Sequence, residues 1–305
     1  MAADLLATAR SGDSRAIARV ISEVEDRTET GRGLSAELYV SGGDAPITGI
    51  TGAPGAGKST LVSALVEHLL GSDRLAIIAI DPSSPFTGGA ILGDRIRMGD
   101  HVGNPDVFIR SLANRGSLGG ISEATPAVVA AFDGLGFGEV LIETVGVGQS
   151  EVEIASTANT TVVVVSPGWG DSVQAAKAGL LEVADILVVN KADRPGADVA
   201  VDDLQAMISM GPERDWTPPV LRTCALDGAG VEELAAAIRD HRRHLSESGE
   251  ALVRRHQRAA SELASALRER MRGMGRTSTN EGLVDRIADR QIDPWSAAAS
   301  LLDPA

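Results

Sequence analysis

Residues 52–59 read GAPGAGKS and match the pattern G-x-x-x-x-G-K-[ST] at every position. The apolar run Ile47–Thr51 before them predicts a strand, and the pattern of Thr60–Leu70 after them predicts a helix. Glycine carries no Cβ, so the backbone N–H groups of such a loop can converge on phosphate oxygens, and the start of the helix adds positive potential. The stretch therefore predicts a phosphate-binding loop at the tip of a strand.

The side chains at the end of this loop have expected tasks. Lys58 places a mobile cation on the β- and γ-phosphates of a nucleotide, and Ser59 offers a hydroxyl to Mg²⁺. Both interpretations depend on the strand–loop–helix context, which the flanking patterns supply. We expect nucleotide contacts from Gly52, Ala53, Pro54, Gly55, Ala56, Gly57, Lys58, Ser59 and Thr60.

Strand-length apolar runs alternate with helical patterns along the chain. This alternation predicts an α/β fold of the P-loop NTPase kind, an open and mostly parallel sheet flanked by helices. Most runs are nearly continuous in apolar residues, as expected for strands that are covered on both faces. The predicted strands are Ile47–Thr51, Ala76–Ile80, Val107–Arg110, Glu139–Glu143, Thr161–Val165, Ile186–Val189 and Val220–Thr223. The predicted helices between and after them are Thr60–Leu70, Ser122–Phe132, Ser172–Glu182, Val199–Ser209 and Val231–Leu245.

The N-terminal part of the chain carries a different pattern. Residues 4–28 place apolar side chains at helical spacing, and Gly12-Asp13 is expected to break this helix into two. A loop-rich entry to the first strand is predicted after it, because glycine and proline accumulate there. These residues are Gly31, Gly33, Gly42, Gly43 and Pro46.

We divide the chain into an N-terminal helical extension (1–45), a P-loop domain (46–246) and a C-terminal helical region (247–305). The last region begins with a predicted long helix over 247–272. Its apolar stripe would either pack on the chain's own domain or form a dimerisation arm, and periodicity cannot name the partner. The stripe consists of Leu252, Ala259, Leu263, Leu267 and Met271.

Charge and cysteine content exclude several classes of protein. The net charge is −14 at pH 7, which argues against nucleic acid or an anionic membrane as the main partner. The single cysteine, Cys224, permits no intramolecular disulfide and no multi-thiolate metal site, and it fits a reducing compartment. The sequence shows no signal peptide and no run of about 18 apolar residues. We therefore expect a cytoplasmic protein that spans no membrane.

Residues 190–193 read NKAD and follow the predicted strand Ile186–Val189. P-loop GTPases read guanine with this pattern. The carboxylate of Asp193 can accept hydrogen bonds from both guanine N1–H and the exocyclic amine, whereas adenine lacks that pair of donors. Asn190 would fasten the loop, and the stem of Lys191 can lie on the plane of the base. GTP and GDP are therefore the expected ligands.

A second base loop is predicted at residues 223–226, which read TCAL after another strand. This resembles the S-A-[LK] loop, whose backbone amide donates to guanine O6. In this setting Cys224 is interpreted as a small packed residue and not as a nucleophile. The expected contacts to the base come from Asn190, Lys191, Asp193, Thr223, Cys224, Ala225 and Leu226.

Three carboxylates are candidates to hold Mg²⁺ together with Ser59. Glu143 opens the stretch ETVG at the position where most GTPases read D-x-x-G, whose carboxylate reaches the metal and whose glycine amide senses the γ-phosphate. Asp81 ends a predicted strand beside the phosphate-loop strand. Asp94 lies in a Gly-Asp-Arg stretch, where a role in a turn or a helix cap competes. Mg²⁺ needs few protein ligands because water and phosphates complete its shell.

The residue that follows the glycine of ETVG is Val147, where Ras-type enzymes carry a glutamine that orients the attacking water. Valine cannot orient a water molecule. We therefore hypothesise slow intrinsic hydrolysis that a partner raises, by ordering a polar side chain two residues further on or in the next loop. The expected catalytic residues are Lys58, Glu143, Gln149, Gln174 and Lys177.

The order of five sequence blocks resembles the MeaB/ArgK family, GTPases of the metallochaperone type associated with methylmalonyl-CoA mutase. The blocks are GAPGAGKS, DPSSPFTGGAILGDRIRM, ETVGVGQSE, GDSVQAAKAGLLEVADILVVNKAD and TCAL, and the resemblance runs from about residue 10 to 302. It implies a homodimer formed through C-terminal helices. It also implies that GTP binding and hydrolysis are coupled to adenosylcobalamin loading into an acyl-CoA mutase, which the GTPase also protects from inactivation.

The same resemblance implies three switch segments. The first would surround Arg95, Met98 and His101, the second would cover Gly146–Glu153, and an additional one at Gly170–Glu182 would relay the nucleotide state to the mutase.

Three other functions compete with this interpretation. A nickel-insertion GTPase would need a Cys and His cluster, whereas this chain has one cysteine and scattered histidines; His241 and His244 share a helical face, but we expect an exposed basic turn there. A kinase or ATPase linked to amino-acid transport would not need the guanine pattern. A binding module without hydrolysis would have lost Lys58 or the metal carboxylates, and these are present.

Overall fold

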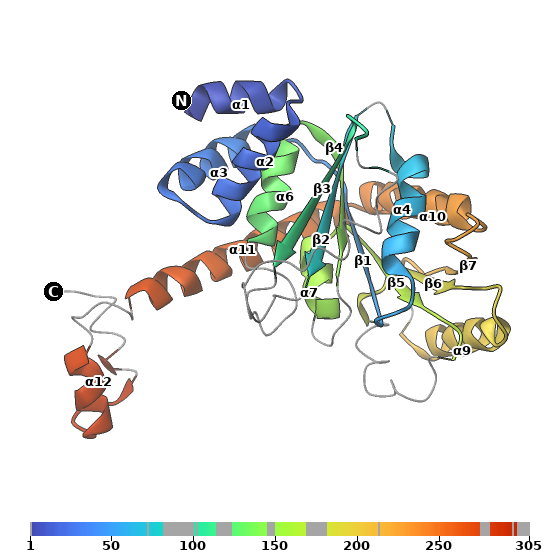
Figure 1. Ribbon diagram of the computed structural model, residues 1–305. Coiled ribbons are helices and arrows are strands. Elements are labelled where there is room, and N and C mark those ends of the chain that lie inside the picture. Colours follow the sequence, from blue (N-terminus) through green and yellow to red (C-terminus); the bar gives the residue numbers. More distant parts are fainter. Residues whose placement is uncertain are drawn as a thin grey trace. The chain divides into compact units, whose positions relative to one another are not determined.

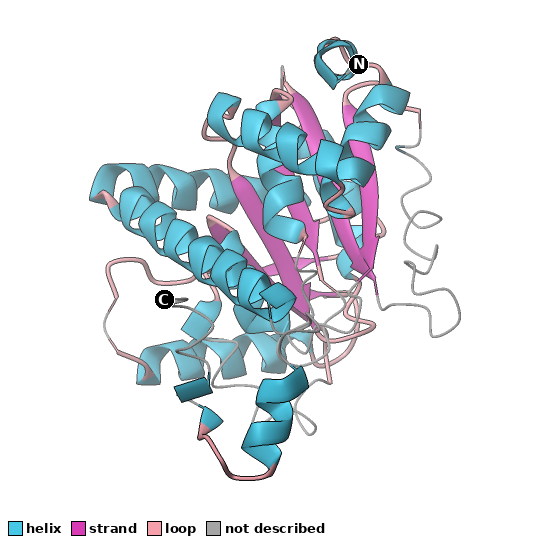
Figure 2. Ribbon diagram, turned by 90° about the vertical axis from the view of Figure 1, so that its left-hand side faces the viewer, coloured by secondary structure: helices cyan, strands magenta, loops and turns pink. Residues whose placement is uncertain are grey.

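The computed structural model describes residues 2–71, 73–81, 101, 103–113, 124–144, 150–168, 182–212, 214–274, 281–294 and 296–297. The contacts divide the chain into two units, Met1–Arg254 and Arg255–Ala305. Across the described residues, seven strands of the first unit form one sheet, with helices on both of its faces (Figures 1 and 2). The division at residues 45/46 and 246/247 stays a prediction.

All strand pairs of this sheet are parallel, which confirms the predicted α/β class. The strand order is β3-β2-β4-β1-β5-β6-β7, so β1 lies between β4 and β5 at the point where the order reverses. Ligands of open α/β sheets bind at the carboxyl ends of strands at such a point. The strands are β1 (Ile47–Gly52), β2 (Arg74–Asp81), β3 (Val107–Ala113), β4 (Phe137–Glu143), β5 (Thr160–Val165), β6 (Ile186–Asn190) and β7 (Val220–Thr223).

Helices cover the sheet on both faces, and this explains the continuous apolar runs. Every residue of β1, β5 and β6 is buried. One core cluster joins α4 and α10 to the strands, and another joins α6, α7 and the N-terminal helices to β2 and β4. Within the described residues, the helices that follow β1 as far as residue 248 are α4 (Lys58–Leu69), α6 (Thr125–Gly134), α7 (Ser150–Thr157), α9 (Ala197–Met210) and α10 (Val231–Ser248).

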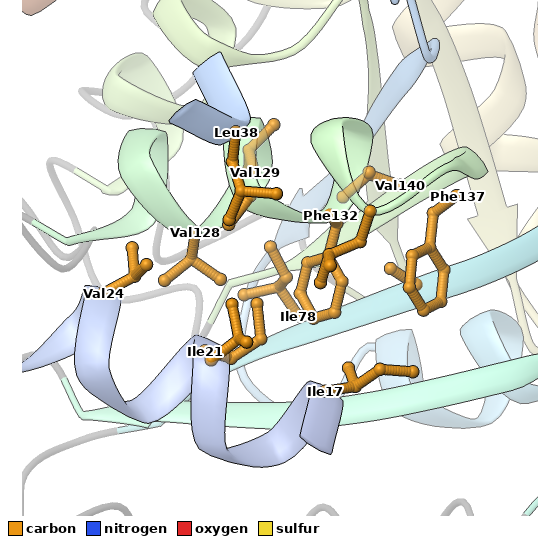
Figure 3. Packing of buried hydrophobic residues seen from close by; sticks show 14 of the residues in the cluster. Ile17, Ile21, Val24, Leu38, Ile78, Val128, Val129, Phe132, Phe137 and Val140 are labelled. Atoms are coloured by element: carbon orange, nitrogen blue, oxygen red, sulfur yellow. The ribbon is translucent and has the colours of Figure 1, made fainter. Parts of the chain in front are cut away.

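Three helices precede the sheet, and their apolar faces close one side of it. They are α1 (Ala2–Arg10), α2 (Ser14–Glu25) and α3 (Glu29–Ser41). In Figure 3 the side chains of Ile17, Ile21 and Val24 on α2 lie against those of α6 and the strands, where Phe132 and Phe137 pack edge to face with ring centroids 5.0 Å apart. The N-terminal helices therefore belong to the core of the first unit.

The helix break at Gly12-Asp13 is confirmed, because Gly12 adopts φ +96° and the Asp13 carboxylate caps α2 by accepting from the Ala16 N–H at 2.7 Å. The loop predicted around Gly31 and Gly33 is wrong, since both residues lie inside α3. A Cβ on Gly31 would lie 1.8 Å from the Glu23 carbonyl oxygen. Glycine is needed here for two helices to approach each other, not for a loop.

The long C-terminal helix is confirmed as α11 (Glu250–Met274), and a shorter one follows as α12 (Glu281–Ala288). Four of the five residues of the predicted stripe are large and apolar and are 49–63% exposed: Leu252, Leu263, Leu267 and Met271. Dimerisation through this helix stays a prediction. Among the described residues, no helix is both long enough and apolar enough to cross a membrane.

Candidate functional site

The phosphate loop begins at Gly52, the last residue of β1, whose φ of +138° only glycine adopts readily. A Cβ on this residue would lie 1.9 Å from the Val164 carbonyl oxygen of β5. Gly57, at φ +94°, closes the loop as the N-cap residue of α4. The loop is thus pressed against β5 at its start and runs directly into a helix N-terminus, where free N–H groups favour an anion.

Lys58 is the first residue of α4 and is only 6% exposed. Its ammonium donates hydrogen bonds to the carbonyl oxygens of Gly52 at 2.7 Å and of Ala53 at 3.1 Å. The side chain therefore curls back over its own loop, and its charge lies beside the backbone that the sequence predicts to hold phosphates.

Ser59 and Glu143 come together, although 84 positions separate them in the sequence. The Ser59 hydroxyl donates to Oε1 of Glu143 at 2.6 Å, and both side chains are buried. One comes from the start of α4 and the other from the last position of β4. A hydroxyl and a carboxylate are oxygen donors of the kind that Mg²⁺ prefers, so this pair fits that ion.

The other two metal candidates are less well defined. Asp81 ends β2, which pairs with β4, so its backbone lies at the same edge of the sheet as Glu143. Asp94 lies outside the described residues. The structure thus brings together two of the four predicted metal residues.

Asn190, the last residue of β6, joins the phosphate loop to the second base loop. Its side-chain amide donates to the Ala56 carbonyl oxygen at 2.9 Å. Its Oδ1 accepts from the Thr223 hydroxyl and from the Ala225 N–H, both at 3.1 Å. Asn190 is 1% exposed, so these hydrogen bonds are shielded from water. The asparagine therefore fastens three loops to one another.

Lys191 and Asp193 lie on the outer side of this junction. The Lys191 ammonium donates to the Gly55 carbonyl oxygen at 2.6 Å, so its stem spans from the NKAD stretch to the phosphate loop. Asp193 is exposed, and its Oδ1 accepts from the Cys224 thiol at 3.5 Å. The two predicted base-reading loops therefore meet at the Asp193 carboxylate.

In the described part of the chain, the backbone N–H groups of the turn that begins at Cys224 donate to acceptors within the protein, with the exception of the Leu226 N–H. Cys224 donates to the Ala229 carbonyl, Ala225 donates to Asn190, and Asp227 donates back to the Cys224 carbonyl. Within the described residues, the Leu226 N–H has no such acceptor. It is the amide of the TCAL loop that can donate to a ligand, a distinction that the sequence could not make.

The Cys224 thiol does not have the environment of a nucleophile. Its pKa is raised, by desolvation first and then by its hydrogen bonds to the carboxylates of Asp227 and Asp193. Both effects disfavour the thiolate, which is the reactive form. This agrees with the interpretation of Cys224 as a packed residue of the loop.

A sequence model of one protein family, described as Methylmalonyl Co-A mutase-associated GTPase MeaB, matches residues 14–280. The chain belongs to the MeaB family. A protein of Pyrococcus abyssi that is named as a GTPase is 43% identical over 98% of this chain and 95% of its own length. The Caenorhabditis elegans protein named methylmalonic aciduria type A homolog, mitochondrial, is 35% identical over 81% of this chain and 67% of its own length.

Among solved structures, a crystal structure of LAO/AO transport system kinase covers 98% of this MeaB-family chain, and this chain covers 96% of it. The TM-score is 0.71 and the sequence identity is 24%. At that identity the likeness concerns the fold alone, and it agrees with the sheet order and the helical layers described above.

Several predicted residues of this MeaB-family site lie where the structure gives no description. They are Arg95 and Met98 of the first predicted switch, Val147 and Gln149 of the second, and Gln174 and Lys177 of the additional one. His101 is described, and its Nε2 lies 2.8 Å from the Ser63 carbonyl oxygen of α4. This residue of the first predicted switch region thus contacts the helix that follows the phosphate loop.

The expectation of an exposed basic turn at His241 and His244 is wrong. His241 is fully buried, because it lies on the face of α10 that packs on the sheet. Its Nδ1 lies 2.9 Å from the Thr160 hydroxyl, and its Nε2 lies 3.3 Å from Asp185 Oδ1. His244 is half-buried against the ring of Trp216, with centroids 5.2 Å apart.

Arg254 completes this polar cluster, with two 2.9 Å hydrogen bonds to the Asp185 carboxylate. Burial alone would raise the pKa of the Asp185 carboxyl, but hydrogen bonds and charges from His241 and Arg254 outweigh it and hold that pKa below its ordinary value. Asp185 precedes β6 and Thr160 begins β5, so the cluster lies at the amino ends of the strands. It is remote from the phosphate loop and serves the fold.

Proposed function

We propose that this MeaB-family GTPase holds GTP or GDP at the phosphate loop with Mg²⁺, and that it uses the nucleotide cycle to serve a cobalamin-dependent acyl-CoA mutase. The contacts of the Asn190 side chain are the observation that best supports nucleotide binding at this site. Its hydrogen bonds join the phosphate loop to both base loops, so this one side chain would set the distance between the two ends of a bound nucleotide.

The phosphate end of the nucleotide would lie in the loop that starts at Gly52 and ends at Gly57. Backbone N–H groups and the N-terminus of α4 supply partial positive charge, and Lys58 supplies a full one. The ammonium already lies over the loop, held by two carbonyl oxygens. We propose that it turns from these acceptors to the β- and γ-phosphates when a nucleotide enters.

Ser59 and Glu143 would hold Mg²⁺ on the side of the loop that faces β4. Their 2.6 Å hydrogen bond brings together two oxygen atoms that can bind a metal ion, one at the start of α4 and one at the end of β4. We propose that Asp81 and Asp94 also bind Mg²⁺, either directly or through a water molecule. When bound, the ion neutralises charge on the phosphate oxygens.

Guanine would be selected by the exposed Asp193 carboxylate, which can accept from guanine N1–H and the exocyclic amine, and by an N–H donor to O6. We assign the latter role to the Leu226 amide. Adenine presents an acceptor at its N1 and a donor at C6, so it would mismatch both groups. Lys191 and Asn190 would keep the two base loops at the right distance from the phosphate loop.

Hydrolysis would be slow until a partner completes the site. Val147 stands where Ras-type enzymes orient the attacking water, and it offers no polar group. We propose that a bound mutase positions Gln149, or Gln174 and Lys177, for this task.

The mutase part of the proposal is supported by the family description and by the name of the C. elegans relative. The exposed apolar side chains of α11 support the proposed homodimer, because a row of large apolar residues in water favours a second apolar surface. The client would be methylmalonyl-CoA mutase or a related cobalamin-dependent acyl-CoA mutase.

The test is to co-purify the full chain with candidate mutases and to measure GTP hydrolysis with and without each of them. We expect one mutase to bind and to raise kcat at least tenfold, and Lys58→Ala to abolish the stimulated rate. ATP serves as the control nucleotide. If no mutase binds or changes the rate, the chaperone role is wrong, whereas rapid GTP turnover by the isolated protein would contradict the proposed dependence on a partner.

A further inference from the structure

Two buried threonine hydroxyls meet beside the proposed metal pair. Thr51 is the residue of β1 directly before the phosphate loop, and Thr144 directly follows Glu143. The Thr144 hydroxyl donates to the Thr51 hydroxyl at 2.8 Å. Thr51 is 0% and Thr144 is 1% exposed, so water does not compete for this bond.

This contact lies where β1 and β4 separate. The last pair in register between the two strands is Ile50 with Glu143. One further backbone hydrogen bond follows, from the Thr144 N–H to the Ile50 carbonyl oxygen at 3.1 Å. Beyond that hydrogen bond, the Thr144–Thr51 hydroxyl bond connects the segment before the phosphate loop with the segment after Glu143. On the opposite side, Gly52 presses the loop against β5.

We infer that Thr51 and Thr144 are positioning residues that set the spacing between Ser59 and Glu143 for Mg²⁺. The inference rests on the proposed function of this site. Mg²⁺ demands near-octahedral geometry at 2.0–2.1 Å from its ligands, so a shift of a few tenths of an ångström between two ligands weakens its binding. Neither threonine is among the proposed Mg²⁺ ligands, so the pair would act by holding the two strand ends together.

The experiment measures the Mg²⁺ concentration that half-saturates the tightening of a fluorescent GDP analogue on the full chain. We compare the unmodified protein with Thr144→Val, Thr144→Ser and the double variant Thr51→Val/Thr144→Val. The first and third variants lose the hydroxyl bond, and we expect their Mg²⁺ midpoints to rise about three- to tenfold, as the loss of one buried hydrogen bond predicts. Thr144→Ser keeps the hydroxyl and should stay within about twofold of the unmodified protein.

The double variant separates positioning from the cost of burying a lone hydroxyl. Replacing both partners by apolar groups of the same shape is nearly neutral for stability. A purely structural role therefore predicts that the double variant recovers the original Mg²⁺ midpoint, and that result would overturn the inference. GDP affinity without Mg²⁺ should be unchanged in all variants.

Thr48→Val is the matched control. Thr48 lies on the same strand and is 0% exposed, but its hydroxyl accepts from Arg242 at the opposite end of β1. We expect this variant to lose stability without a change in the Mg²⁺ midpoint. An equal rise in this control would also overturn the inference. If the unmodified protein shows no Mg²⁺-dependent GDP binding at all, the proposed function fails, and the inference with it.

Discussion

Gly57→Ala should destabilise the phosphate loop through a defined collision. Gly57 adopts φ +94°, and a Cβ there would lie 2.4 Å from Nδ2 of Asn190, the atom that holds the Ala56 carbonyl. A left-handed backbone costs alanine about 1–2 kcal/mol. Moving Asn190 breaks at least one buried hydrogen bond and strands its partner, which adds about 1–3 kcal/mol. The sum is a loss of about 2–5 kcal/mol.

Gly55→Ala is the matched control for this prediction. Gly55 also has a positive φ, of +77°, but a Cβ there would meet nothing within 4 Å. It should cost only the backbone term, about 1–2 kcal/mol. The difference between the two variants therefore isolates the collision with Asn190.

Thermal unfolding of the nucleotide-free protein measures both variants. For a chain of this size, 1 kcal/mol shifts Tm by about 2 °C. We expect Gly57→Ala to lower Tm by about 4–10 °C and Gly55→Ala by about 2–4 °C. Equal losses in the two variants would refute the claim that Asn190 fastens the phosphate loop.

Two further predictions concern other parts of the fold. Gly31→Ala should lower the free energy of unfolding by more than about 2 kcal/mol, because its Cβ would lie 1.8 Å from the Glu23 carbonyl oxygen. Gly33→Ala, whose Cβ would meet nothing within 4 Å, should stabilise α3 by about 0.5–1 kcal/mol. Urea unfolding measures both variants, and a Gly31 variant as stable as the unmodified protein would contradict the packing of α3 on α2. Asp185→Asn should lower the unfolding free energy at pH 7. Because the folded-state pKa of Asp185 is lowered, its contribution is present above the ordinary value of about 4 and is lost as pH falls through the folded value. The two proteins should therefore converge in acid, and a difference that persists there speaks against this cluster.

The local elements of the site could be predicted from the sequence because each depends on a short stretch of adjacent residues. The apolar run before GAPGAGKS and the helical pattern after it correspond to β1 and α4. The NKAD stretch begins at Asn190, the last residue of β6, directly after the apolar run that predicts this strand. Continuous Val and Ile runs indicated strands covered on both faces, which is how β5 and β6 lie.

Contacts between distant segments could not be predicted in the same way. Gly31 has the same local signal as a loop glycine, and only the approach of α3 to α2 explains it. His241 pairs with Asp185, 56 positions earlier, so helical spacing alone could not show that it is buried. The Thr51–Thr144 bond likewise appears only when segments 93 positions apart lie side by side, and the bond from the Ala225 N–H to Asn190 spans 35 positions.

We propose above all that the loops joined at Asn190 hold a guanine nucleotide, with its phosphates at Lys58 and its base at Asp193. Calorimetry of the full chain with Mg²⁺ tests this claim most directly, by comparing GDP with ADP and then repeating both titrations with Asp193→Asn. Two charge-assisted hydrogen bonds are worth about 3–6 kcal/mol, so GDP should bind at least about 100-fold more tightly than ADP, and the variant should lose most of that preference. ADP affinity within tenfold of GDP affinity, or a preference that survives in the variant, would contradict the account.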